Sequence, residues 1–188
     1  MILEKVEDRR VVLQGLSSCR TAQSAALLRE LRLGFPGCEI QLFRADRVAG
    51  KEHLLFAAIE AIRAFRQHRE RARTLAVELL LYVSCQRQIS KAIQLLGVGP
   101  RTADVVFAAI TNDETDPQAL GRKAASAFSA QEDDRVVEII SRKKSRELMR
   151  AYKVSATEIE AAKQPDEDGT SVLKRLVIER SALLAVEK

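Results

Sequence analysis

The chain of 188 residues is long enough for one domain that buries its own core without disulfides or structural metals as staples. Charged residues make up 30% of it and hydrophobic residues 46%, as in ordinary soluble proteins, and the formal net charge of +5 matters only where cations cluster. Because no apolar run of about 18 residues occurs and the N-terminus lacks a signal-peptide pattern, we expect a cytoplasmic protein without a membrane partner.

The first third of the chain predicts a strand, a helix and a second strand. Segments 9–14 (RRVVLQ) and 38–43 (CEIQLF) are short and rich in residues that favour strands, and the second follows a turn sequence. Between them Thr21 is a candidate N-cap for a helix. The apolar positions of that helix recur at helical spacing and are Ala25, Leu28 and Leu31.

From about Gly50 the pattern predicts three consecutive helices. The first ends near His68, and its apolar stripe consists of Leu55, Ile59, Ile62 and Phe65. The second, 75–84, follows the candidate N-cap Thr74 and is apolar nearly all round, which predicts a position in the centre of the domain. The third, 89–96, has apolar residues at the spacing typical of a half-buried helix, and Gly97 is expected to end it.

Glu78 is the one acid in the apolar second helix. A carboxylate in such a place could be catalytic, but buried carboxylates are seldom left without a cationic partner. We therefore expect Glu78 to pair with an arginine such as Arg73 or Arg87.

The second half of the chain predicts a buried strand followed by several helices. Segment 103–111 (ADVVFAAIT) has the length and β-branched content of a core strand, although its periodicity also permits a helix. A helix at about 117–128 lies between acidic segments, and two short helices follow, of which the second begins with a capping box formed by Ser155 and Glu158. The last helix spans 170–186.

The sequence LLGVGPRTADVV, around Gly97 and Gly99, resembles the helix-hairpin-helix signature of DNA glycosylases. In that motif a glycine turn between two helices offers backbone N–H groups to a phosphate. A DNA-binding or DNA-repair protein centred on this turn is the alternative function, and it requires a helix over residues 103–110. The reading we favour is a helix C-cap followed by a turn into a strand, because only Asp104 lies near the turn as a catalytic acid and the downstream segment is acidic.

Cations cluster in two segments. The segment 63–73 (RAFRQHRERAR) holds five arginines, and 142–150 (RKKSRELMR) holds Arg142, Lys143, Lys144, Arg146 and Arg150. Such runs usually form a solvated face, but few acids are interleaved here, so a polyanion such as RNA is the natural partner if the clusters bind one.

The last helix has more apolar surface than one buried stripe requires. From Val172 to Val186, ten of fifteen residues are apolar. The surplus favours docking to another protein or burial of the helix on several sides, and the pattern does not separate the two.

Reactive side chains are few. The three cysteines, Cys19, Cys38 and Cys85, are widely spaced, and with only two histidines they do not make a tetrahedral zinc site. The sequence lacks GxSxG, HExxH and GxGxxG, and we expect neither a metal nor a cofactor.

Several segments in order resemble one family. They are HLLFAAIEAIRAF, RTLAVELLLYVS and QRQISKAIQLLGV in the middle of the chain, then T..VVFA, LMRAYKVS and an apolar C-terminal helix. This combination, over about residues 9–186, resembles the kinase-binding regulatory subunit of the KEOPS complex, the PRPK-binding protein or CGI-121 family. The resemblance implies an α+β fold, a small mostly antiparallel sheet packed against several helices, in a single domain over 1–188. It also implies that the segment 112–135 is variable, since it is longer than in compact relatives.

The resemblance further implies a subunit that is not an enzyme. It would bind the atypical kinase-like ATPase of KEOPS directly and the transferase subunit through that kinase, in a complex that makes N6-threonylcarbamoyladenosine at position 37 of tRNA. It would also help to bind tRNA by the 3′ CCA tail. By position, the expected kinase surface is Leu173, Leu176, Val177 and Leu183. The residues expected to contact tRNA are Arg63, Arg71, Arg73, Arg87 and Lys91.

Overall fold

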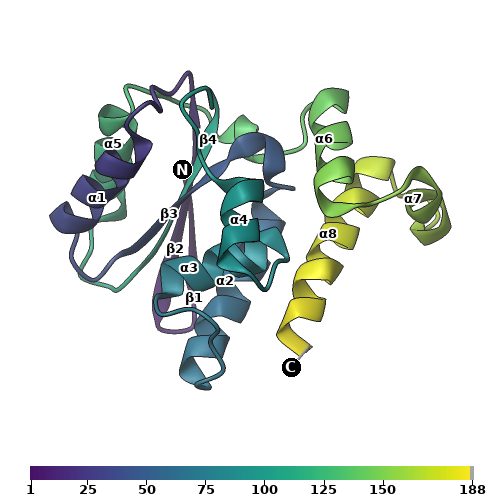
Figure 1. The fold of residues 1–188 in the computed structure, drawn as a ribbon, viewed down its shortest axis with the longest axis horizontal. Coiled ribbons are helices and arrows are strands. Elements are labelled where there is room, and N and C mark those ends of the chain that lie inside the picture. The colour runs from purple at the N-terminus through teal and green to yellow at the C-terminus, as the bar shows by residue number, and fades with distance from the viewer. Residues whose placement is uncertain (187–188) are drawn as a thin grey trace.

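A computed structural model describes residues 1–186, which form an antiparallel sheet with helices on both faces (Figure 1). The strands are β1 (Ile2–Val6), β2 (Arg9–Ser17), β3 (Glu39–Arg44), β4 (Val105–Thr111) and β5 (Gln131–Glu132). Their order is β1-β2-β4-β3, with β5 paired to β2, and every pairing is antiparallel. The α+β class expected from the sequence is confirmed.

The described helices alternate with these strands and then complete the C-terminal third. They are α1 (Ser24–Gly34), α2 (Lys51–Arg66), α3 (Leu75–Ser84), α4 (Ile89–Leu96), α5 (Pro117–Ala127), α6 (Arg142–Tyr152), α7 (Ala156–Ala162) and α8 (Gly169–Val186). Two 3-10 helices, η1 (Ala45–Arg47) and η2 (Asp134–Val137), connect the sheet to α2 and to α6. None of the helices described here is both long enough and apolar enough to cross a bilayer.

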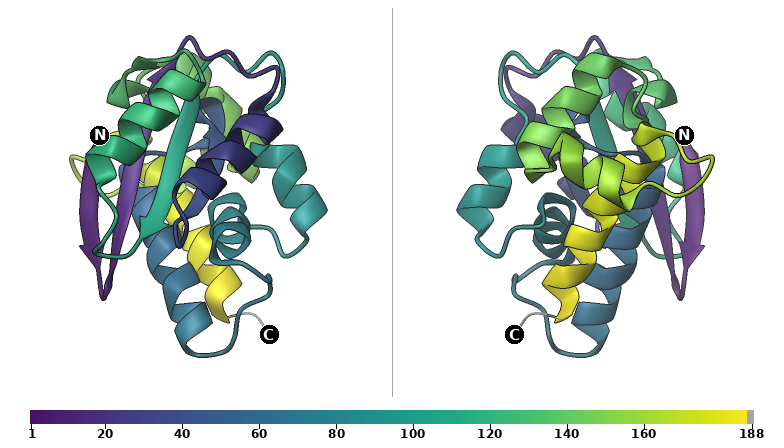
Figure 2. Two further views of the ribbon diagram at one scale, coloured as in Figure 1. Left: turned by 90° about the vertical axis from the view of Figure 1, so that its left-hand side faces the viewer. Right: turned by 90° about the vertical axis from the view of Figure 1, so that its right-hand side faces the viewer.

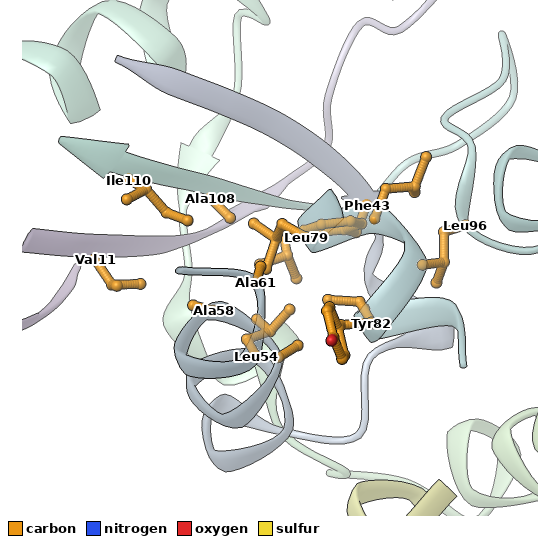
Figure 3. Close-up of a cluster of buried hydrophobic side chains, with 14 of the residues drawn as sticks. Val11, Phe43, Leu54, Ala58, Ala61, Leu79, Tyr82, Leu96, Ala108 and Ile110 are labelled. Atoms are coloured by element: carbon orange, nitrogen blue, oxygen red, sulfur yellow. The ribbon is translucent and has the colours of Figure 1, made fainter. Parts of the chain in front are cut away.

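The central strand β4 is buried throughout and supplies side chains to both faces of the sheet. Because side chains alternate along a strand, Val106, Ala108 and Ile110 point to one face, and Val105, Phe107 and Ala109 point to the other. On the first face they pack against α2 and α3, as Figure 3 shows for Ala61, Leu79 and Ile110. On the second face α1 and α5 cover the sheet.

A third group of buried apolar side chains lies away from the sheet, where α6 and α8 meet. It consists of Ala49, Leu148, Tyr152, Val154, Val172, Leu173, Leu176 and Val177. Both views of Figure 2 show α8 beside α2, with the C-terminal ends of the two helices at the same end of the molecule. The last helix is therefore covered by the chain itself along most of its length.

Two details of the fold differ from the sequence prediction. Strand β1 was not expected, because its segment ILEKV is mostly exposed at an edge of the sheet and carries charged side chains, as edge strands often do. Thr21 is not the N-cap of α1. That position is Gln23, and the Thr21 hydroxyl instead lies 2.8 Å from the carbonyl oxygen of Gly99 and 2.9 Å from that of Thr102.

Other local predictions are confirmed. The hydroxyl of Thr74 accepts a hydrogen bond of 3.3 Å from the backbone N–H of Val77, so Thr74 caps α3. Ser155 and Glu158 form the expected capping box of α7. The helix expected at about 117–128 is α5, and Leu120, Ala124 and Phe128 of this region are buried against the sheet.

Candidate functional site

A groove of about 440 Å³ opens where the C-terminal ends of α3 and α6 meet the start of α4 and the end of α8. Its lining residues are Cys85, Gln86, Arg87, Gln88, Lys91, Ala151, Tyr152, Lys153, Arg180, Leu183 and Leu184. We call this the α4–α8 groove. Among these lining residues there are four cations and no carboxylate, so the groove attracts anions.

Local backbone geometry places the cations around the groove. Cys85 and Lys153 each adopt a left-handed conformation, with φ of 54°, and thereby end α3 and α6. The turn at Cys85 sends the chain into α4, so that Arg87, just before the helix, and Lys91, in its first turn, both line the groove. Arg180 comes from α8 and is paired with Glu158 of α7 at 2.7 Å. Within residues 1–186 no ion pair is recorded for Lys91 or Lys153.

A buried polar network fixes the helices beneath the groove. The hydroxyl of Tyr152 lies 2.8 Å from the carbonyl oxygens of both Arg47 and Val83, and the Ser181 hydroxyl donates a bond of 2.9 Å to the carbonyl of Tyr82. These contacts join α6, α3 and α8. The ring of His53 meets the ring of Tyr152 edge-on at 5.7 Å.

The groove carries no group prepared for covalent chemistry. Burial raises the pKa of the Cys85 thiol to about 12, and the nearby Arg180 only partly opposes this, so the reactive thiolate is scarce at neutral pH. No cluster of three potential metal ligands occurs in the part of the chain that the structure describes. The arrangement is suited to binding an anionic partner.

The four residues expected at a kinase surface do not lie together on the outside. Leu173, Leu176 and Val177 are buried in the apolar group between α6 and α8. Of the expected set only Leu183 is accessible, with 56% of its surface exposed, and Val186 beyond it is 74% exposed. Of the four expected residues, only Leu183, near the end of α8, is therefore accessible to a partner.

Arg71 has an internal role that the sequence did not indicate. One of its guanidinium N–H groups donates to the carbonyl oxygen of Leu184 at 2.7 Å, and another lies 3.9 Å from the Glu78 carboxylate. Glu78 accepts hydrogen bonds from the backbone N–H groups of Arg71 and Ala72 at 2.9 and 2.8 Å. Burial raises the pKa of Glu78 above its ordinary value, and these bonds and the charge of Arg71 only partly oppose the rise.

The expected arginine partner of Glu78 is thus present, and it is Arg71 and not one of the two arginines named as examples, Arg73 and Arg87. Arg71 fastens the end of α8 to the loop between α2 and α3. Its guanidinium is committed to this contact and is a poor candidate for RNA.

The other residues expected to contact tRNA are divided between separate places. Arg87 and Lys91 both line the α4–α8 groove. Arg63 is exposed on α2 and paired with Glu60 at 2.9 Å. Arg73 lines a different hollow, near β1 and β2, together with Arg9 and Arg66. The structure therefore brings together two of the five predicted residues and adds Lys153 and Arg180, which sequence reasoning missed.

The turn at Gly97 and Gly99 is not a helix-hairpin-helix. Residues 105–111 form strand β4 in the middle of the sheet, so the second helix that this alternative requires is absent from the segment. The Gly99 N–H donates to the Thr102 hydroxyl at 3.0 Å and is not available to a phosphate. The interpretation as a turn into a strand is confirmed.

A comparison with known families finds a match over most of the chain. A family model described as kinase binding protein CGI-121 matches residues 20–185, which covers the groove and nearly all of α8. No curated protein matches the chain. Because the match spans most of the sequence, the chain belongs to the CGI-121 family of kinase-binding proteins.

Proposed function

We propose that this chain is a non-catalytic, cytoplasmic regulatory subunit of the KEOPS complex, which makes N6-threonylcarbamoyladenosine at position 37 of tRNA. The observation that carries the proposal is the match of a kinase-binding family to residues 20–185. The resemblance of the central motifs to the KEOPS subunit supplies the rest of the assignment.

The direct partner in this proposal is the atypical kinase-like ATPase of KEOPS. Leu183 and Val186 form an exposed apolar end on α8, and exposed apolar side chains on a helix are suited to a hydrophobic groove on a partner. The transferase subunit would be reached through the kinase. Leu173, Leu176 and Val177 would support the contact from inside by holding α8 in place.

The second partner is tRNA. Arg87, Lys91 and Lys153 surround a groove that contains no carboxylate in the described residues, next to the exposed end of α8. Charged side chains of this kind neutralise phosphates. In this proposal they hold the backbone near the 3′ CCA tail, so that the anticodon loop reaches the transferase.

Purification of the tagged chain from its native host tests this proposal. The expected result is co-purification of the KEOPS kinase and transferase together with tRNA. Recovery of the kinase without tRNA, combined with unchanged tRNA affinity after Lys91→Gln and Lys153→Gln substitution, would instead support an adaptor that does not contact nucleic acid. Recovery of neither protein would overturn the assignment to KEOPS.

A further inference from the structure

The second basic cluster forms a strip along the outer face of α6. Arg142, Arg146 and Arg150 recur every four residues, so they lie on one side of the helix about 6 Å apart along its axis. Lys143 lies next to them, and Lys153, the C-cap, continues the strip. All five side chains are exposed. We call this set the α6 strip, and it extends over roughly 16 Å.

Lys144 belongs to the same run in the sequence but not to the strip. Its ammonium group is buried and donates to the carbonyl oxygens of Val136 and Val137 at 2.7 and 2.9 Å. It therefore stabilises the end of η2. The burial of Leu148 and Tyr152 likewise places the apolar side of α6 against α8, so the basic side faces outward.

The cations of the strip are largely without acidic partners. Many arginines elsewhere on the surface are neutralised, as in the pairs Arg175 with Glu167 and Arg135 with Asp133. On α6 the one acid is Glu147, and it already accepts bonds from Arg47 and Arg150. Within residues 1–186 no ion pair is recorded for Arg142, Lys143, Arg146 or Lys153. Self-repulsion in such a row is relieved by a polyanion.

The surroundings of the strip indicate which polyanion fits. Helices that lie on membranes insert an exposed apolar face, but the apolar face of α6 is buried. Surfaces that bind single strands stack bases on exposed aromatic rings, whereas the one aromatic side chain of α6, Tyr152, is only 5% exposed. A row of exposed cations along a helix, without aromatic rings, is suited to the backbone of an RNA duplex, which proteins recognise through phosphates and shape.

We propose that the α6 strip is a second RNA contact, which binds the phosphate backbone of a double-stranded stem. This inference rests on the proposed tRNA-binding function and extends it to a different surface. Lys153 belongs both to the strip and to the α4–α8 groove, so the two contacts are continuous. A tRNA whose 3′ end occupies the groove then has its adjoining stem along α6. The contact contributes affinity and orientation without sequence selectivity.

A charge-matched pair of triple variants tests this proposal. The strip variant is Arg142→Gln, Arg146→Gln and Arg150→Gln. The control variant is Arg29→Gln, Arg122→Gln and Lys123→Gln, which removes the same charge from exposed residues of α1 and α5, on the side of the molecule away from α6 (Figure 1). Binding of tRNA is measured from ~50 to ~200 mM salt, by the chain alone and by the chain bound to its kinase. The RNAs are intact tRNA and tRNA lacking its last three nucleotides.

The expected result is a loss of affinity on the order of tenfold for the strip variant, with a salt dependence reduced by about three released counterions, while the control variant matches wild type. The loss should be equal for intact and shortened tRNA, because the strip contacts the stem. Equal affinities of the strip and control variants for tRNA would overturn the inference, and so would a loss that disappears with shortened tRNA. Stronger binding of the wild-type chain to phosphatidylserine vesicles than to tRNA would assign the strip to a membrane.

The same experiment separates this inference from the proposed function. If wild type binds tRNA and the strip variant binds equally well, only the strip is excluded and the groove remains as the RNA site. If wild type binds no RNA in either state, the RNA part of the proposed function fails together with the strip. Kinase binding is measured on the same samples. Neither of these two outcomes changes the conclusion about the kinase partner.

Discussion

The guanidinium of Arg71 donates a hydrogen bond of 2.7 Å to the carbonyl oxygen of Leu184, and this bond connects the loop after α2 to the last turn of α8. A helix leaves its last four carbonyl groups without partners in the helix, so a cation at this end satisfies one carbonyl and interacts favourably with the helix dipole. The Glu78 carboxylate, 3.9 Å from the Arg71 guanidinium, helps to hold Arg71 in this position. Arg71 thereby ties the end of α8 to the body of the domain.

Substitution of Arg71 by alanine should loosen the end of α8. Loss of the charge-assisted bond and of the partner of a buried carboxylate should lower the free energy of unfolding by about 2–4 kcal/mol. Hydrogen exchange at the amides of the last turn of α8 should accelerate. Arg69→Ala is the matched control, because Arg69 is exposed in the same loop and its side chain bonds only to Gln67 among the described residues. Equal exchange in the two variants would contradict the role given to Arg71.

Leu176 and Leu183 should respond differently to truncation. Leu176 is buried between α6 and α8, so Leu176→Ala should cost about 2–5 kcal/mol of stability through lost burial and a cavity. Leu183 is exposed, and Leu183→Ala should change stability by less than about 1 kcal/mol. Urea unfolding of both variants checks the pair. A large loss of stability on truncation of Leu183 would show that this side chain is not available to a partner.

The hydroxyl of Tyr152 should stabilise the junction of α6 with α3 and η1. Tyr152→Phe keeps the packed ring and removes the group that lies 2.8 Å from the carbonyl oxygens of Arg47 and Val83. Because buried carbonyl groups then lose a partner, we expect a cost of about 1–3 kcal/mol. Thermal unfolding measures it. An unchanged midpoint would mean that the two carbonyl groups are satisfied without the hydroxyl.

His53 should make the protein less stable in mild acid. Burial lowers the pKa of His53 to about 4 from its ordinary value of 6.5, and the nearby Lys144 acts in the same direction. Between these values the unfolded chain binds more protons than the folded chain, so stability is present above pH 6.5 and falls as the pH decreases towards 4. The expected contribution is on the order of 3 kcal/mol.

Two histidine variants isolate this effect. His53→Gln should flatten the dependence of stability on pH between 6.5 and 4. His68→Gln should leave the dependence as in wild type, because His68 is exposed. Urea unfolding at several pH values gives the comparison. A wild-type slope that persists in His53→Gln would assign the acid sensitivity to other groups.

Much of the fold follows from local sequence patterns. Thr74, Ser155 and Glu158 mark helix starts by side chains that satisfy backbone N–H groups within one turn, and such contacts are visible in the sequence. The buried strand β4 is recognisable from its β-branched residues. The N-cap prediction for Thr21 was wrong because its hydroxyl lies beside the carbonyl oxygens of Gly99 and Thr102. These residues lie 78 and 81 positions later in the sequence, so no local pattern indicates the contact.

The candidate site was only partly predictable, because its side chains come from distant segments. The apolar excess of α8 is visible in the sequence, but the side of the helix that is buried depends on how α2, α3 and α6 pack against it. The sequence therefore does not distinguish the buried Leu176 from the exposed Leu183. Charge alone likewise did not distinguish Arg71, which is fastened to Leu184, from Arg87 at the groove. Lys153 was missed because its relevance arises from the turn that ends α6.

The most direct test of the central claim is the affinity of the purified chain for the KEOPS kinase of the same organism, measured by calorimetry. We expect a stable complex of wild type, and binding weakened by tenfold or more in Leu183→Glu, since a charge would be buried at the contact. Leu33→Glu, which alters a leucine that is 76% exposed on α1, should bind as wild type does. Absence of a wild-type complex, or equal affinity of Leu183→Glu and Leu33→Glu, would contradict kinase docking at the end of α8.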